Sequence, residues 1–255
     1  MSRKIDCRKD IRIILKMNLI YRSVCFFILG SLFISDVFAN ILEVTPVQLF
    51  LSSNQRIGVV KVTNRSNERS LLQLSLLDWQ QSPNGRNIYK ISHDILLTPP
   101  LFILPAHKTQ VIRFALRHPI YNTVQKAYRV HLKEVQQPRQ KKLGQTLYFL
   151  MDISLPLFVQ PQRIVENGIW STKTLDAHHI KLNLYNDGNV SLFVNQWQLL
   201  SNKPYGSIMK KHSTFSYILP RCSHSWIVKG DSNINYTDIK SNINGQTKQS
   251  ALHRL

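Results

Sequence analysis

Cysteine is scarce in this sequence. Three cysteines occur among 255 residues, and two of them, Cys7 and Cys25, lie in the first 39 residues. If that segment is removed, Cys222 remains alone and no intramolecular disulfide can form. Stability must then come from core packing, even in an oxidising compartment.

The motifs of common enzyme sites are also missing. There is no Gly-x-Ser-x-Gly nucleophile turn, no phosphate-binding glycine loop and no dinucleotide-binding fingerprint. His178-His179 and the pair Cys222/His224 each supply two candidate ligands, whereas a metal site needs three or four. Carboxylates are few, and Asp176 and Asp187 have no obvious partner for paired-acid catalysis. We therefore expect neither an enzyme nor a metal or cofactor site.

Acidic residues are few, with 14 Asp and Glu against 33 Lys and Arg. Removing the first 39 residues takes away seven basic and three acidic residues, which leaves 26 and 11 and a net charge near +15. The electrostatic field of this positive net charge favours anionic partners but specifies no fold. The export signal described next argues against nucleic acid, so anionic membrane surfaces and acidic client proteins remain.

An apolar run from Ser23 to Ile34 lies near the N-terminus and is too short to indicate a membrane span. It is followed by Val37-Phe38-Ala39, in which Val37 and Ala39 have the spacing that signal peptidase accepts. We interpret residues 1–39 as a secretory signal, after whose cleavage no stable membrane insertion is expected; the alternative is an uncleaved anchor. Translation can begin at Met1 or at Met17.

Short alternating segments separated by turn residues follow, and no amphipathic helix is indicated. Such spacing with Pro-rich connections is typical of an antiparallel β-sandwich. Strands are expected at 47–51, 57–63, 70–79, 109–116, 128–134, 180–185, 192–200, 216–220 and 225–228, with 180–185 and 192–200 forming a hairpin. A linker at 160–168 divides this all-β protein into two predicted domains. The first covers residues 40–162, and the second, smaller one covers 163–255; the sequence pattern indicates the last strands of the second domain only weakly.

The most informative stretch runs from Gln145 to Pro161. Its odd positions form an unbroken apolar row: Leu147, Phe149, Met151, Ile153, Leu155 and Leu157. This is the period of a long strand with one apolar face. Pro156 lacks an N–H and therefore indicates a sheet edge or a break. The row is either the core face of a sandwich or, in part, a surface lent to another protein.

Several motifs resemble those of the PapD-like periplasmic chaperones of pilus assembly over essentially the whole chain after residue 39. They are Thr45-Pro-Val, Val60-Lys-Val-Thr-Asn64, Trp79, Thr98-Pro-Pro100, Leu104-Pro105, Gln110-Val-Ile-Arg113, Tyr128-Arg129 with Glu134, Ser154-Leu-Pro-Leu-Phe-Val159, Asn186-Asp-Gly-Asn189 and Tyr217-Ile-Leu-Pro220. Each motif is weak alone, but their order and spacing are specific.

The resemblance implies two immunoglobulin-like sandwiches arranged as a boomerang in a periplasmic protein. Such a chaperone would lend the strand at 145–158 to an incomplete pilus or fimbrial subunit and deliver that subunit to an outer-membrane usher. Strand addition of this kind uses main-chain hydrogen bonds for affinity and alternate side chains for specificity. The matching inserted residues are Leu147, Phe149 and Met151, with Gln145 and Ile153 at the margins.

The sequence also departs from this family. The best-known members anchor the C-terminal carboxylate of the subunit with two basic residues, at positions that align with Gln48 and Pro156 here. The Ser-Leu-Pro form at 154–156 is similar to the divergent, archaic branch. Arg113 matches an arginine that pairs with acids between the domains, but the aligned acidic position is Gln125.

A different basic residue must then hold such a carboxylate. The strand that precedes the lent strand starts at Lys126 and should run antiparallel to it, so its beginning faces the later half of the lent strand. Arg129 is its one arginine and is our first candidate, with Lys126 second; a solvated basic face is the alternative. For the whole protein, the alternative function is a secreted basic β-sandwich binding module without a chaperone cycle.

Overall fold

A computed structural model describes residues 42–118, 121–136, 149–201, 211–229, 234 and 236–254. This part of the chain consists of strands and loops, which confirms the all-β prediction. It contains no helix long and apolar enough to cross a membrane. The segment 1–39 and the residues Gln145 and Leu147 lie outside the described residues, so the predictions about them remain predictions.

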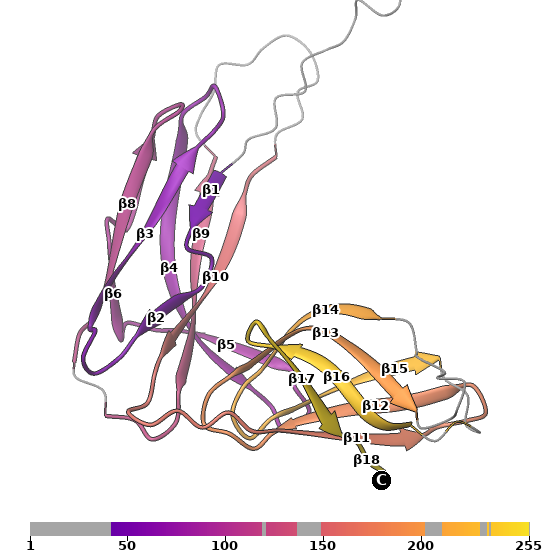
Figure 1. Ribbon diagram of the computed structural model, residues 1–255. Coiled ribbons are helices and arrows are strands. Elements are labelled where there is room, and N and C mark those ends of the chain that lie inside the picture. Colours follow the sequence, from indigo (N-terminus) through magenta and orange to yellow (C-terminus); the bar gives the residue numbers. More distant parts are fainter. Residues whose placement is uncertain are drawn as a thin grey trace, which may run out of the picture. The chain divides into compact units, whose positions relative to one another are not determined.

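The first sandwich contains two sheets, one antiparallel and one mixed (Figure 1). Its strands are β1 (Leu42–Thr45), β2 (Leu49–Leu51), β3 (Ile57–Asn64), β4 (Ser70–Gln81), β5 (Asn87–Ile91), β6 (Ile95–Thr98), β7 (Leu101–Leu104), β8 (Thr109–Leu116), β9 (Lys126–Val135) and β10 (Asp152–Val159). One sheet has the order β1-β3-β8-β6. The other has the order β2-β10-β9-β4-β5, with β7 also paired to β4 and β2 parallel to β10.

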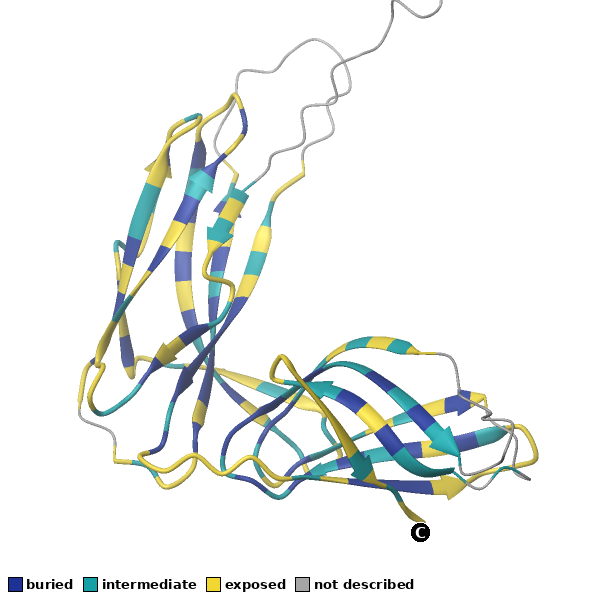
Figure 2. Ribbon diagram, viewed as in Figure 1, coloured by how far each residue is buried: buried dark blue, intermediate teal, exposed yellow. Residues whose placement is uncertain are grey.

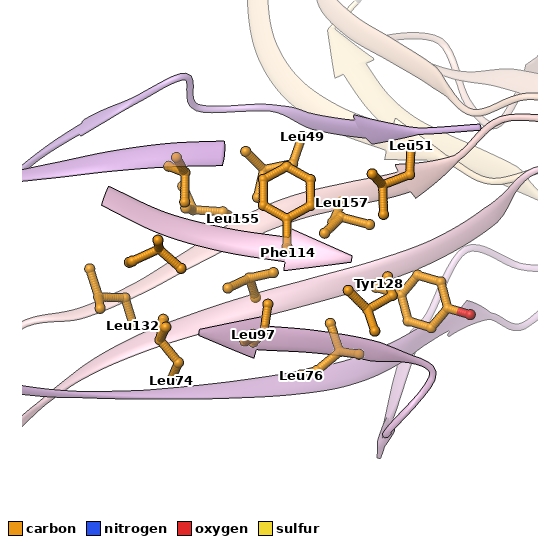
Figure 3. Packing of buried hydrophobic residues seen from close by; sticks show 14 of the residues in the cluster. Leu49, Leu51, Leu74, Leu76, Leu97, Phe114, Tyr128, Leu132, Leu155 and Leu157 are labelled. Carbon is orange, nitrogen blue, oxygen red and sulfur yellow. The ribbon is translucent and has the colours of Figure 1, made fainter. Parts of the chain in front are cut away.

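The core of this sandwich forms where the inward faces of the two sheets meet. Buried and exposed residues alternate along β4 and β9 (Figure 2), as the two-residue period of a strand requires. Phe114 from one sheet packs among leucines of the other, including Leu155 and Leu157 of β10 (Figure 3). The later part of the apolar row is therefore core.

The second sandwich also has two sheets, with the orders β15-β12-β11-β18 and β14-β13-β16-β17. Its strands are β11 (Gly168–Thr174), β12 (His179–Asn186), β13 (Leu192–Ser201), β14 (His212–Ile218), β15 (Ser223–Lys229), β16 (Tyr236–Ile243), β17 (Gln246–Ala251) and β18 (His253–Arg254). Trp170 and Trp197 are the largest of its fully buried side chains. The boundary between residues 162 and 163 remains a prediction.

The expected hairpin between β12 and β13 is wrong. β12 pairs with β11 and β15, whereas β13 pairs with β14 and β16, so the two strands lie in opposite sheets. The connecting turn is held inside the sandwich, because the buried Asn186 amide donates to the carbonyls of Val190 and Ile218. A Cβ on Gly188 would lie 2.3 Å from the carbonyl oxygen of Val165. The Asn-Asp-Gly turn therefore carries the chain from one sheet to the other.

Candidate functional site

The first half of β10 has an open edge. β10 pairs with β9 from Asp152 to Val159, but with β2 only from Leu157 to Val159. Residues Asp152 to Pro156 therefore have a strand neighbour on one side only, among the strands that the structure describes. An open edge of this kind can accept a strand from another chain.

The direction of the backbone groups along β10 follows from two hydrogen bonds. Glu134 of β9 donates its N–H to the Met151 carbonyl at 2.7 Å, whereas the Gln160 N–H donates to Leu51 next to β2 at 2.8 Å. Because backbone groups alternate sides along a strand, odd residues face β9 and even residues face the side of β2. Pro156 is an even residue, so its lack of an N–H removes no hydrogen bond to β9. Ser154, also even, presents its backbone groups to the open edge.

The side chains of the odd row pass from core to solvent. Leu157 and Leu155 are buried, and Ile153 is partly buried against the same core. Met151 is half-buried, and Phe149 is 74% exposed. Both sequence interpretations therefore apply to the described residues: the later half of the row is core, and its earlier half is an exposed apolar surface.

Side chains of β9 hold the beginning of β10. The buried Glu134 accepts a hydrogen bond from the Met151 N–H through Oε2 at 3.3 Å. On the outer face, His131 Nδ1 lies 3.3 Å from Asp152 Oδ1, and His131 Nε2 lies 3.2 Å from Ser154 Oγ. These contacts fix the strand where the exposed part of the row begins.

Arg129 lies on the outer face of the same sheet. It is paired with Pro156 of β10 and with Leu77 of β4. Its guanidinium carbon is 3.8 Å from the centroid of the Trp79 ring and 5.4 Å from that of Tyr217. Burial lowers the pKa of Arg129, and the nearby tyrosine oxygens oppose that shift. Its Nε is buried and has no hydrogen-bond partner among the described residues.

Aromatic rings surround Arg129. Phe158 contacts Trp79 at 6.0 Å and Tyr217 at 5.8 Å between centroids, and Phe50 of β2 stacks on Phe158 at 5.8 Å. Phe158 is a large apolar residue on the even face, where it follows Asp152, Ser154 and Pro156, and this is a sequence signal for burial on both faces of the strand end. Sequence reasoning did not use that signal, and it did not place Tyr217 beside Arg129.

The other anchor candidates differ in position. Gln48 donates through Nε2 to the Tyr217 hydroxyl at 2.6 Å, so it converges with Arg129 on the same tyrosine. Burial raises the pKa of Tyr217, while this hydrogen bond and the charge of Arg129 act in the opposite direction. Lys126 is exposed at the start of β9, opposite Val159.

Gln125, at the position expected to be acidic, makes neutral hydrogen bonds in place of an ion pair between the domains. The backbone N–H of Gln125 donates to the Asn189 carbonyl at 2.8 Å, and its side-chain oxygen accepts from the Ser191 N–H at 2.8 Å. Its amide nitrogen donates to Gln160. Arg113 lies exposed on β8, opposite Val59 and Thr98. A role for Arg113 between the domains remains a prediction.

In the described residues, no three His, Cys, Asp or Glu side chains are placed to hold a metal ion. Cys222 is buried, which raises the pKa of its thiol. Its sulfur lies 3.5 Å from the Gln81 carbonyl oxygen. What the geometry offers is therefore an open strand edge, an exposed apolar row and an arginine held among aromatic rings.

Comparisons with known proteins agree with this geometry. Residues 41–165 match the family model of the PapD N-terminal domain of pili and flagellar-assembly chaperones. No curated protein sequence matches significantly. Among solved structures, the chain resembles the CsuC–CsuE chaperone–tip adhesion subunit complex of archaic Csu pili of Acinetobacter baumannii, with 15% identity, a TM-score of 0.64 and coverage of 84% of this chain and 99% of that chain.

Two further structures show the same fold. The Salmonella enterica SafB chaperone in complex with the SafA pilin has 15% identity and a TM-score of 0.58, over 85% of this chain and 95% of that chain. The Escherichia coli chaperone DraB has 16% identity and a TM-score of 0.57, over 85% of this chain and 97% of that chain. The match of residues 41–165 to this family model shows that the chain belongs to the PapD-like family of pili and flagellar-assembly chaperones.

Proposed function

We propose that this protein binds and stabilises pilus or fimbrial subunits in the periplasm by lending them the edge of β10, and that it delivers them to an outer-membrane usher. The observation that carries the proposal is the apolar row of β10. The row leaves the core at Ile153, reaches solvent at the exposed Phe149 and lies beside an open backbone edge. CsuC and SafB are both described in complex with a subunit, which supports the same role here.

The mechanism follows from the alternation along β10. A client that lacks its last strand pairs with the even backbone groups, beginning with Asp152 and Ser154. The odd side chains Leu147, Phe149 and Met151 then enter the groove of the client, with Gln145 and Ile153 at its margins. Burying each large apolar side chain contributes about 1.5–3 kcal/mol before the costs of association. The exposed part of the row is thereby covered while the client remains folded.

Arg129 is the proposed anchor for the C-terminal carboxylate of the client. Its cation is held over Trp79 and is partly removed from water, so a carboxylate there would form a charge-assisted hydrogen bond in a weakly screened environment. The Gln48 amide is placed to assist as a neutral donor beside Tyr217. Lys126 is the second basic candidate.

Export is the first step of the proposed cycle. The apolar run that ends in Val37-Phe38-Ala39 predicts cleavage after Ala39. N-terminal sequencing of the protein recovered from the periplasm should therefore begin at Asn40. Recovery of a chain that retains residues before Asn40 would contradict the proposed cleavage.

Capture of a client tests the chaperone proposal itself. The small exported β-subunits encoded in neighbouring reading frames are co-expressed one at a time with this protein, and the complexes are purified from the periplasm. At least one subunit should co-purify in a soluble one-to-one complex and should be degraded or aggregate without its partner. Failure of every neighbouring subunit to do so would reject the proposal.

The charge near +15 after residue 39 favours one competing function, a secreted module that binds anionic surfaces. Such a module would bind anionic vesicles in a salt-sensitive manner, because exposed charges are screened by added salt. It would not need a strand edge or a client. If replacing Phe149 and Met151 left the binding of subunits unchanged but high salt abolished it, this module would be favoured over the chaperone.

A further inference from the structure

β14, at the edge of a sheet in the second sandwich, carries exposed aromatic residues. It pairs only with β13 among the described strands, and the two strands lie side by side (Figure 1). Tyr217 of β14 lies directly opposite Phe193 of β13, and their rings stack at 4.4 Å between centroids. Phe215 precedes Tyr217 by two residues and is 81% exposed. The centroids of the Phe215 and Phe193 rings are 6.4 Å apart. The three rings therefore share the outer face of this sheet.

These rings continue directly to the proposed anchor. Tyr217 meets Trp79 edge-on at 5.4 Å between centroids, and its ring centroid is 5.4 Å from the guanidinium carbon of Arg129. We call the series Phe215, Phe193, Tyr217 and Trp79 the aromatic track. It joins an exposed phenylalanine of the second sandwich to the arginine of the first through successive ring contacts.

Packing of the protein's own core does not explain the exposed end of the track. Phe193 and Tyr217 are only half-buried, and Phe215 is mostly exposed. A single exposed apolar side chain is ordinary on a protein surface. Phe215, Phe193 and Tyr217 are in ring-to-ring contact on an open edge and lead to a partly desolvated cation, and exposed apolar clusters of this kind mark interaction sites.

We propose that Phe193 and Phe215 form a second contact for the client, which receives an aromatic or branched aliphatic side chain from the client surface next to its anchored C-terminus. This inference rests on the proposed chaperone function. Continuity with Arg129 selects the client as the occupant, because a chain end held at that residue brings the adjoining client surface onto the track. Ring stacking then favours aromatic side chains in particular.

Photo-crosslinking tests the contact directly in the full-length protein. Phe215 is replaced by p-benzoylphenylalanine, and the variant is co-expressed with the neighbouring subunit that co-purifies with the unaltered protein. Ile227, which is 69% exposed on β15, is the matched control position. We expect a crosslink to the client from position 215 and none from position 227. Normal capture with no crosslink from 215, or a crosslink from 215 to a second copy of this chain, would overturn the inference while leaving the chaperone function intact.

Affinity provides an independent measurement. Phe215→Ser should weaken the complex about two- to tenfold, the range expected for one aromatic contact, and Phe215→Trp should restore it. Ile227→Ser should leave the dissociation constant unchanged. Equal effects of Phe215→Ser and Ile227→Ser would overturn the inference, whereas loss of capture by the unaltered protein would instead reject the chaperone function on which it rests.

Discussion

The guanidinium carbon of Arg129 lies 3.8 Å from the centroid of the Trp79 ring. This contact holds a cation on the outer face of the sheet, while its Nε is buried without a hydrogen-bond partner in the described residues. A partly desolvated cation with an unused donor is costly unless an anion pairs with it. The arrangement supports the proposal that Arg129 binds the C-terminal carboxylate of a client.

Arg129→Ala should weaken client capture about ten- to hundredfold, the range for a hydrogen bond to a charged group. Lys133→Ala, on the same outer face but exposed and opposite Asp152, should have little effect. The measurement is the dissociation constant for a client with a free or an amidated C-terminus. Arg129→Ala should matter only for the free carboxylate, so equal losses for both clients would show that Arg129 is not the anchor.

The exposed half of the apolar row should bind clients without being needed for folding. Phe149→Thr combined with Met151→Thr preserves strand propensity but removes most of the apolar surface offered to a client. We expect capture to be lost while the free energy of unfolding falls by about 1 kcal/mol or less, because Phe149 is exposed and Met151 is only partly buried. Pull-down and urea denaturation of the free chaperone measure the two effects.

A substitution further along the same row is the matched control. Leu157 is fully buried, so Leu157→Ala should cost about 2–5 kcal/mol of unfolding free energy. If the double Thr variant were as destabilised as Leu157→Ala and still captured clients, the exposed half would be core, and strand lending would be the wrong mechanism.

The strands that carry the site could be predicted because period two is a strong signal where one face is buried. The alternation after Tyr128 and the row through Leu157 predict that β9 and β10 are antiparallel neighbours, and the pairing confirms it. The sequence could not show where the row leaves the core, because Phe149 and Leu155 are equally apolar. That point depends on the length of β9, which ends at Val135.

Other elements gave weak or misleading local signals. β17 is an edge strand with mostly exposed polar residues, so no apolar alternation marks it. The Asn186 turn looks like a hairpin turn, but its buried side-chain hydrogen bonds join opposite sheets. The aromatic surroundings of Arg129 include Tyr217, which is distant in sequence. Contacts of this kind depend on tertiary packing and have no periodic signature.

Burial of His224 makes stability depend on pH. Its ring lies edge-on to Trp226 at 4.6 Å, and burial lowers its pKa below the usual value for histidine, about 6.5 in the unfolded chain. The stabilising contribution is therefore complete above about pH 6.5 and decreases as the pH falls toward the folded-state pKa, because the unfolded chain binds the proton more readily.

His224→Gln removes this titration. The free energy of unfolding should then fall less steeply between about pH 7 and pH 5 than in the unaltered protein, since the folded and unfolded states no longer differ in proton uptake at this position. Urea denaturation at several pH values measures the two slopes. Parallel curves would show that His224 does not contribute to the acid sensitivity.

Gly85 lies in the turn after β4, where this turn contacts the second sandwich. Its φ is +84°, and a Cβ there would lie 2.5 Å from the Ser223 carbonyl oxygen. The turn is held by the Ser223 N–H and hydroxyl, which donate to the Pro83 carbonyl at 3.0 and 2.9 Å. An alanine would therefore meet both an unfavourable backbone conformation and a steric clash.

Gly85→Ala should consequently destabilise the protein more than Gly245→Ala. Gly245 has a similar φ of +81°, but nothing lies within 4 Å of its potential Cβ, so it reports the conformational cost alone. That cost is about 1–2 kcal/mol for a left-handed residue. The additional loss in Gly85→Ala, measured as a lower urea midpoint, then isolates the contact with Ser223. Equal midpoints for the two variants would mean that the turn moves aside freely and that its hydrogen bonds to Ser223 add little stability.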